Sequence, residues 1–235
     1  MKLTFFGHSA FAIEAGGTRI LIDPFFTGNP AFPQGLDPMD AAGNAQHIVL
    51  THGHGDHVGD TVAIAQKTGA IVTANYDLAM WLHARGVDNI NPTNTGGTVD
   101  LGAFKVTYVQ AHHSSAHLSE DGVSHGLGHS NGVVIEIAGE KTLYHAGDTD
   151  IFSDMALIEE FHAPKIGILP VGDRFTMGAK KAAVAARRYF NFETVIPCHF
   201  GSFPIVDPSA DAFVEAMGDA AGMVRVMQPG ETVTL

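Results

Sequence analysis

The sequence is poor in cysteine and has no long hydrophobic run. Its single cysteine is Cys198, so an internal disulfide is impossible, and such cysteine usage is typical of a reducing compartment. No apolar run approaches the ~18 residues that a membrane-spanning helix needs. The first residues also lack a basic region followed by a continuous apolar core, as a secretion signal would have. We therefore expect a cytoplasmic protein with no membrane partner.

Basic residues are also scarce. Lys and Arg number 13 against 25 Asp and Glu, which gives a formal net charge of −12. A surface this acidic repels phosphate backbones, so nucleic acid is not an expected partner. We expect a small-molecule substrate, and we leave open whether the chain forms a homo-oligomer.

The composition excludes disordered and fibrous proteins, since 45% of the 235 residues are hydrophobic and 16% are charged. The length predicts one domain over residues 1–235. Strand-like and helix-like segments occur in both halves, which favours two packed sheets with helices outside. Loops are predicted over 27–44 and 114–130. The predicted strands are 3–6, 10–14, 19–22, 47–50, 70–73, 99–101, 104–109, 133–137, 142–144, 166–170, 194–197, 224–227 and 232–235, and the predicted helices are 60–67, 76–85, 154–161, 178–189 and 209–217.

Histidine, in contrast, is abundant, with 14 residues. Three of them form the segment His52-x-His54-x-Asp56-His57. Residues i and i+2 of an extended backbone project to the same side, so His52 and His54 can hold one ion, while Asp56 and His57 face a neighbouring point. Imidazole and carboxylate are good ligands for zinc, and a closed structural zinc site would usually use several cysteines. The segment therefore predicts an open, catalytic metal site.

Further ligands are expected at the ends of other predicted strands. His112 and His113 follow one strand, Asp148 follows a second and His199 follows a third. Each of these residues alone is more often structural, because Asp forms turns and a histidine after a strand is usually hydrogen-bonded. Taken with the histidine segment, they complete two coordination shells.

These residues resemble the metallo-β-lactamase superfamily, whose hallmark is His-x-His-x-Asp-His followed by a His, a bridging Asp and a last His. Over nearly the whole chain the sequence is similar to a branch of cytoplasmic metal-dependent hydrolases that includes ascorbate-6-phosphate lactonase. The motifs that carry this second likeness are Gly7-His8-Ser9, Leu21-Ile22-Asp23-Pro24, Asn94-Thr95-Gly96-Gly97, His113-Ser114-Ser115, Ala146-Gly147-Asp148-Thr149, Asp173-Arg174-Phe175-Thr176-Met177-Gly178 and Pro197-Cys198-His199.

The resemblance implies an α/β (α+β) fold, the four-layer αββα sandwich, with two divalent ions at one edge of the sheets. Zinc is expected, with manganese or iron as alternatives. His113 is preferred over His112 because the family histidine directly precedes a small polar pair, here Ser114-Ser115. The implied ligands are His52, His54 and His113 for one ion, Asp56, His57 and His199 for the other, and Asp148 as the bridge between them.

The predicted activity is that of a binuclear metal-dependent hydrolase, in which a metal-bound hydroxide attacks a small ester, lactone or phosphoester. Asp56 is the candidate catalytic residue, because it both binds metal and orients the nucleophile. One alternative is a phosphodiesterase or nuclease acting on RNA, which the negative charge disfavours. Another is a non-hydrolytic metal-binding or regulatory protein, which the complete ligand set disfavours.

Residues around the ligands carry weaker predictions. His8, His112, Phe175 and Thr176 are candidates for binding substrate. Asp23 is a candidate for accepting a hydrogen bond that fixes the metal-binding loop, a contact that ligating histidines usually need. Each of these residues has a structural alternative, such as a strand hydrogen bond, a turn or the start of a helix.

Overall fold

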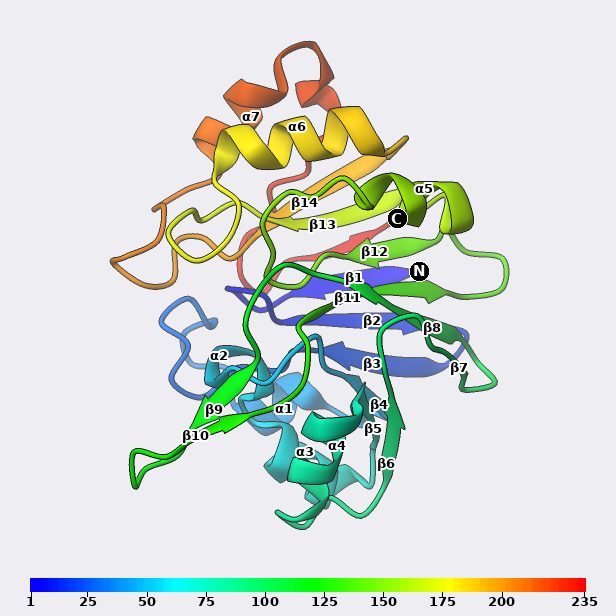
Figure 1. The fold of residues 1–235 in the computed structure, drawn as a ribbon, viewed down its shortest axis with the longest axis vertical. Coiled ribbons are helices and arrows are strands. Elements are labelled where there is room, and N and C mark those ends of the chain that lie inside the picture. The colour runs from blue at the N-terminus through cyan, green and yellow to red at the C-terminus, as the bar shows by residue number, and fades with distance from the viewer.

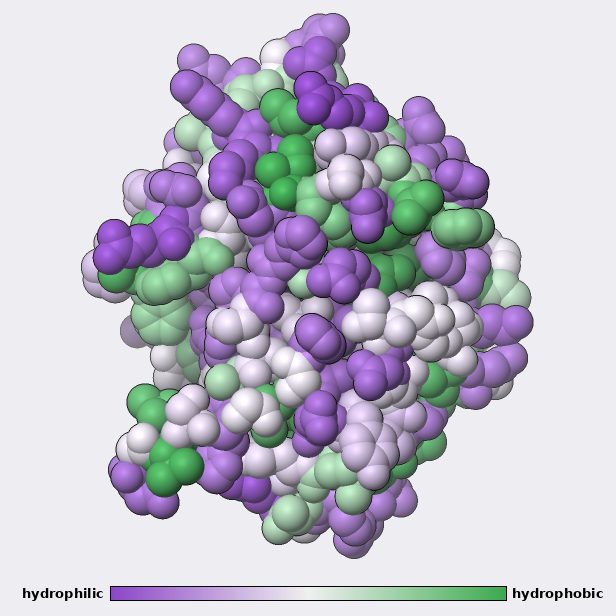
Figure 2. All heavy atoms as spheres, viewed as in Figure 1, coloured by the Kyte–Doolittle hydropathy of each residue, from purple (hydrophilic) through white to green (hydrophobic).

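Two large β-sheets lie face to face, and helices cover the outer side of each sheet (Figure 1). The computed structural model describes residues 1–235. The predicted αββα sandwich is confirmed. No helix is long and apolar enough to cross a membrane. On the face seen in Figure 2, hydrophilic residues predominate and the hydrophobic ones form separate small groups.

The first sheet has the order β15-β1-β2-β3-β4-β5-β6. Strands β1, β2 and β3 form an antiparallel meander, while β3 to β6 run parallel to one another. This arrangement places the β1–β2 turn and the carboxyl ends of β3, β4 and β5 at one edge. The strands are β1 (Lys2–Phe5), β2 (Phe11–Ala15), β3 (Thr18–Ile22), β4 (His47–Val49), β5 (Ile71–Asn75), β6 (Ile90–Thr93) and β15 (Thr232–Thr234).

The second sheet has the order β14-β13-β12-β11-β8-β7. Strands β12, β13 and β14 are parallel, and β8 runs in the same direction because both β8 and β12 are antiparallel to β11. The carboxyl ends of β8, β12 and β14 therefore share one edge. The strands are β7 (Thr98–Asp100), β8 (Lys105–Gln110), β11 (Asn131–Glu136), β12 (Leu143–His145), β13 (Ile166–Pro170) and β14 (Thr194–Cys198).

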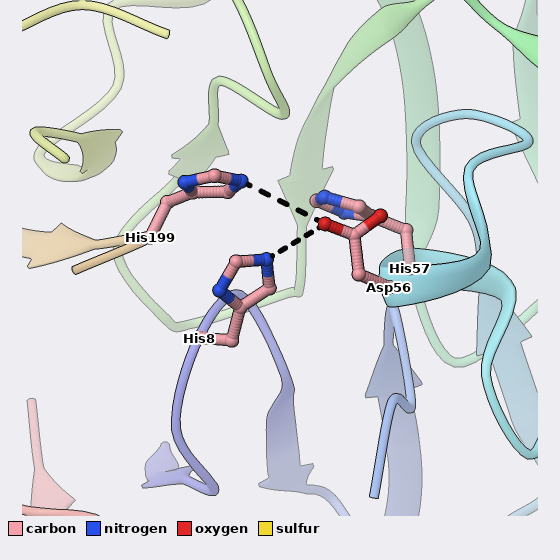
Figure 3. Close-up of side chains that lie close together, drawn as sticks. All are labelled: His8, Asp56, His57 and His199. Atoms are coloured by element: carbon pink, nitrogen blue, oxygen red, sulfur yellow. Dashed lines mark hydrogen bonds and ion pairs between the residues drawn. The ribbon is translucent and has the colours of Figure 1, made fainter. Parts of the chain in front are cut away.

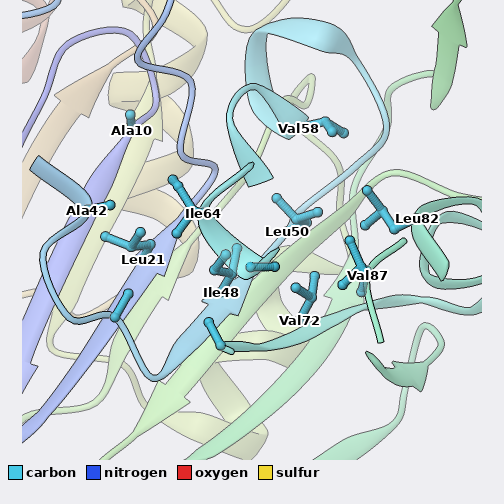
Figure 4. Close-up of a cluster of buried hydrophobic side chains, with 14 of the residues drawn as sticks. Ala10, Leu21, Ala42, Ile48, Leu50, Val58, Ile64, Val72, Leu82 and Val87 are labelled. Carbon is cyan, nitrogen blue, oxygen red and sulfur yellow. The ribbon is translucent and has the colours of Figure 1, made fainter. Parts of the chain in front are cut away.

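Alternating side chains divide the core into three layers. In β3, Ile20 and Ile22 face the other sheet, and Leu21 faces the outer helices. Figure 4 shows that outer layer. A third layer lies between the second sheet and its own helices. Helices α1 (Pro38–Ala42), α2 (Gly55–Val58), α3 (Thr61–Thr68) and α4 (Tyr76–His83) follow strands of the first sheet, whereas α5 (Met155–His162), α6 (Ala179–Tyr189), α7 (Asp211–Met217) and a 3₁₀ helix (Gly218–Met223) belong to the second.

Three local predictions are wrong. The predicted loop 27–44 contains α1, which Asp37 caps by accepting hydrogen bonds from the backbone of its first turn. The predicted loop 114–130 contains a hairpin of β9 (Ala116–Leu118) and β10 (Ser124–Gly126). The predicted strand 224–227 is only an isolated bridge between Val195 and Val224.

Candidate metal centre

All seven predicted ligands lie at the shared edge of the two sheets. The segment from His52 to His57 follows β4 of the first sheet, and α2 begins within it. The second sheet contributes His113 after β8, Asp148 after β12 and His199 after β14. The strand directions described above bring these ends together, so the site is assembled from both sheets.

Three sets of side chains could each hold a metal ion, because the ligand atoms within each set lie within 4.8 Å of one another. Two of these sets contain the groupings predicted for the two ions, and one set adds His8, which was not predicted as a ligand. Figure 3 shows this last set, drawn from the β1–β2 turn, α2 and the end of β14. The sets are His52, His54 and His113; His52, His57 and Asp148; and His8, Asp56, His57 and His199.

The first set is a group of nitrogen donors. His54 Nδ1 lies 3.0 Å from His52 Nε2 and 3.3 Å from His113 Nε2. Burial lowers the pKa of His52 well below its usual value, and it also lowers the pKa of His54 and of His113. Neutral imidazoles whose nitrogens converge in this way offer lone pairs to a common point, which suits a divalent metal ion.

Asp148 faces histidines of both predicted ligand groups. Its Oδ1 is 3.3 Å from His57 Nε2, while its Oδ2 is 3.1 Å from His199 Nε2 and 3.6 Å from His113 Nε2. Burial alone would raise the pKa of Asp148, but the facing His199 and His57 hold it well below its usual value. Asp148 Oδ1 and His57 Nε2 are both buried, and although they are 3.3 Å apart, neither has a partner in hydrogen-bond geometry. Such atoms are costly unless something binds them, and a cation fits both.

Asp56 is the more accessible carboxylate. Its side chain is 33% exposed, and its Oδ2 lies 3.1 Å from His8 Nε2 and 4.0 Å from His199 Nε2. Burial raises the pKa of Asp56, but the hydrogen bond from His8 and the nearby His57 outweigh it, so the net shift is downward. Asp56 is therefore ionised at neutral pH and faces solvent on one side.

Asp23 determines which ring nitrogen carries the hydrogen in two predicted ligands, His57 and His52. Its carboxylate accepts hydrogen bonds from the Thr51 backbone (2.8 Å), the Thr51 hydroxyl (2.6 Å) and His57 Nδ1 (2.7 Å). Because the Thr51 hydroxyl donates to Asp23, its oxygen accepts from His52 Nδ1 at 3.0 Å. The hydrogen on Nδ1 of each ring leaves Nε2 to face the site. Asp23 thus accepts hydrogen bonds from the predicted metal-binding loop, and its effect on metal binding stays a prediction.

Three residues of the site have a left-handed backbone. The φ angles are 56° at His8, 45° at Asp23 and 58° at His199. Residues other than glycine seldom adopt such angles, which cost of order 1–3 kcal/mol each and occur mostly where the surrounding structure enforces them. His199 also donates its backbone N–H to His8 O at 2.7 Å, which ties the two sheets together.

Residues 18–200 match the family model of the beta-lactamase superfamily domain. The chain belongs to this superfamily. It is 59% identical over 99% of both chains to a UPF0173 metal-dependent hydrolase of Sinorhizobium medicae, and 56% identical over the full length of both to one of Methylobacterium nodulans. These relatives identify it as a metal-dependent hydrolase.

Two solved structures are similar to this chain over almost its whole length. Igni18, a metallo hydrolase from Ignicoccus hospitalis, is 35% identical, covers 99% of this chain and 97% of its own, and has a TM-score of 0.85. An isothiocyanate hydrolase from Delia radicum gut bacteria is 19% identical over 100% of this chain and 99% of its own, with a TM-score of 0.79. The second likeness shows the fold alone.

The other predicted residues are outside the three ligand sets, except His8. His112 is exposed, its ring stacks on Phe152 with centroids 4.6 Å apart, and it is not part of the ligand sets. Phe175 is 53% exposed and Thr176 is half-buried, both in the loop after β13. His8 is fully buried. The sequence did not predict its hydrogen-bond partner Ser202. Ser202 lies in a turn that contains Gly and Pro, and a serine in such a turn carries no signal of a functional role.

Ser115 braces the metal-binding loop of the superfamily site. Its hydroxyl accepts a hydrogen bond from the Gly53 backbone at 3.1 Å and donates one to Leu127 O at 2.9 Å. A Cβ on Gly53 would lie 2.7 Å from Leu127, so only glycine allows this close packing. The segment that carries β9 and β10 thereby holds the predicted ligands His52 and His54 in place.

Gly172 packs directly against the backbone of His199, a predicted ligand. A Cβ built on Gly172 would lie 1.9 Å from His199 O, a backbone atom. We expect Gly172→Ala to shift His199, to lower the free energy of unfolding by about 1–3 kcal/mol or more, and to reduce the metal content. Urea unfolding and elemental analysis measure both effects. Gly222→Ala is the matched control, because a Cβ there meets nothing within 4 Å, and equal behaviour of the two variants would contradict the prediction.

Proposed function

We propose that this superfamily member is a binuclear hydrolase of a small ester, lactone or phosphoester. The observation that supports this proposal most is the placement of Asp148, whose two oxygens face imidazoles of both ligand sets. A carboxylate in this position can bind two ions at once, as two-metal hydrolytic sites require.

The donor atoms indicate which ions would fit. His52, His54 and His113 would hold one ion, Asp56, His57 and His199 the other, and Asp148 both. Imidazole-rich sites with carboxylate support suit zinc, and manganese or iron are alternatives. Divalent ions so held lower the pKa of a water molecule to near neutrality and polarise the oxygen of the bond to be cleaved.

The protein groups position the reactants. Asp56 is ionised and partly exposed, so it can accept a hydrogen bond from the attacking water and orient it toward the substrate. Asp23 holds the ring of His57 through Nδ1, which keeps Nε2 directed at the site. No serine nucleophile is needed for this reaction.

The charge of the protein supports a small substrate. The excess of acidic residues, with a net charge of −12, disfavours a polyanion such as RNA. Lys181, a basic residue of α6, is paired with Asp150 at 2.8 Å. We therefore propose substrates with one ester, lactone or phosphoester group.

The proposal is tested by metal analysis and a substrate panel. We expect purified protein loaded with zinc or manganese to contain two ions per chain and to hydrolyse a lactone, thioester or small phosphodiester. Chelation should abolish turnover, and metal should restore it. A maximum of one ion per chain would contradict the binuclear site, and turnover of RNA alone would replace the proposed substrate class.

A further inference from the structure

His8 is a buried histidine whose two ring nitrogens both have polar partners. Its Nε2 lies 3.1 Å from Asp56 Oδ2, and its Nδ1 lies 2.7 Å from the hydroxyl of Ser202. The ring is fully buried and packs against Phe25, Phe203 and His199, with centroids 5.9, 5.4 and 4.0 Å away. The ring is therefore held in one orientation, and it has no surface for a substrate.

The partners of His8 determine where its proton lies. The carboxylate of Asp56 is ionised and can only accept a hydrogen bond, so His8 Nε2 must carry the hydrogen. Nδ1 of the neutral ring is then an acceptor, and the Ser202 hydroxyl donates to it. The result is a directed chain from Ser202 through His8 to Asp56, in which Asp56 sets the tautomer of His8 and Ser202 donates to the remaining ring nitrogen.

The same geometry argues against direct metal binding by His8. The contact between His8 Nε2 and Asp56 Oδ2 at 3.1 Å has the geometry of a hydrogen bond, and a ring nitrogen that carries the hydrogen of such a bond has no lone pair for a metal ion. Asp56 Oδ2 is also closer to His8 than to His199, at 3.1 Å against 4.0 Å. His8 thus contacts the ligand rather than taking the place of one.

We propose that His8 is a positioning residue, which holds the Asp56 carboxylate through its Nε2–H and is itself oriented by Ser202. This inference rests on the proposed binuclear function, because it assigns Asp56 to the second ion. The strained backbone of His8 supports it, since a left-handed φ of 56° directs the ring from the β1–β2 turn into the site. Without His8, the carboxylate of Asp56 is free to rotate away.

Two substitutions of His8 distinguish the contact made by Nε2 from the contact made by Nδ1. The amide nitrogen of Asn corresponds in reach to Nδ1, so His8→Asn loses the contact with Asp56, and Asn also tolerates a left-handed φ. The amide nitrogen of Gln corresponds to Nε2, so His8→Gln retains a donor toward Asp56. Ser202→Ala removes the hydrogen bond to Nδ1 that orients the His8 ring, without changing residue 8 or any predicted ligand.

The test is the dissociation constant of the second zinc ion, measured by titrating metal-free protein against a chromophoric chelator. We expect His8→Asn to weaken this constant about 10- to 100-fold, Ser202→Ala to weaken it less, and His8→Gln to stay within about threefold of the unsubstituted protein. The first zinc ion should bind as before in all three variants. The melting temperatures of the metal-free proteins provide the readout for a merely structural role, and these should change little.

The outcomes are distinguishable. Unsubstituted protein that binds only one ion contradicts the binuclear function itself. If it binds two ions and His8→Asn binds the second equally well, only the role of His8 is overturned. If His8→Gln loses the second ion as fully as His8→Asn does, His8 acts as a metal ligand, and the positioning role is likewise overturned.

Discussion

Replacing Asp148 by alanine should remove most of one metal equivalent per chain and lower kcat/KM by on the order of 10³-fold, equivalent to about 4 kcal/mol of transition-state stabilisation. Asp148 is the one carboxylate that faces His57, His113 and His199 together. Without it, the imidazoles of both sets lose their shared negative charge. We expect His57→Ala to lose a metal equivalent as well, because His57 faces Asp148 through Nε2. Elemental analysis and steady-state kinetics measure these effects.

Asp150→Ala is the control for this substitution. Asp150 lies two residues further along the chain, is about half exposed, and pairs with Lys181 at 2.8 Å. Its removal should leave metal content and kcat/KM within about twofold, since exposed ion pairs contribute little. Unchanged metal content in both Asp148→Ala and His57→Ala would refute the ligand assignment.

Among residues that are not predicted ligands, we expect Asp23→Ala to cause the largest loss of stability and of metal affinity. Asp23 and His57 are both fully buried, and removing one partner of a buried pair costs about 3–5 kcal/mol. The variant also frees the rings of His57 and His52, so metal affinity should fall about 10- to 100-fold. Urea unfolding of metal-free protein and zinc titration separate the two effects.

Two further variants make this prediction specific. Asp23→Asn keeps an oxygen acceptor and tolerates the left-handed φ of 45°, so its loss of stability should be smaller than that of alanine. Asp37→Ala removes the cap of α1 and should cost about 1 kcal/mol without changing metal affinity. Asp23→Ala that binds zinc as tightly as Asp37→Ala would show that Asp23 does not orient the ligands.

The meeting of the predicted ligands at one edge could be predicted because they lie at strand ends. His113, Asp148 and His199 each follow a strand whose apolar pattern is clear, and parallel strands present their carboxyl ends at one edge. The choice between His112 and His113 came from the resemblance alone. In the structure His113 lies in the first ligand set, whereas His112 stacks on Phe152.

Contacts between distant segments could not be predicted. Ser202 and His8 are joined through a hydrogen bond that depends on the packing of the two sheets.

The strand β6 contains Pro92, and proline is usually a signal against a strand. The short hairpin of β9 and β10 gains its stability from packing on Gly53 and Trp81 through Leu127 and His117, which its own polar sequence does not reveal.

The division of the ligands between two sheets has a consequence for unfolding. The first sheet supplies His52, His54, Asp56 and His57, and the second supplies His113, Asp148 and His199. Ions held by both, as we propose, would act as cross-links between distant parts of the chain, and their binding free energy would add to the free energy that keeps the sheets docked. Dissociation of the layers and release of the ions would then be a single cooperative event, and we expect resistance to denaturant to rise with the concentration of free metal.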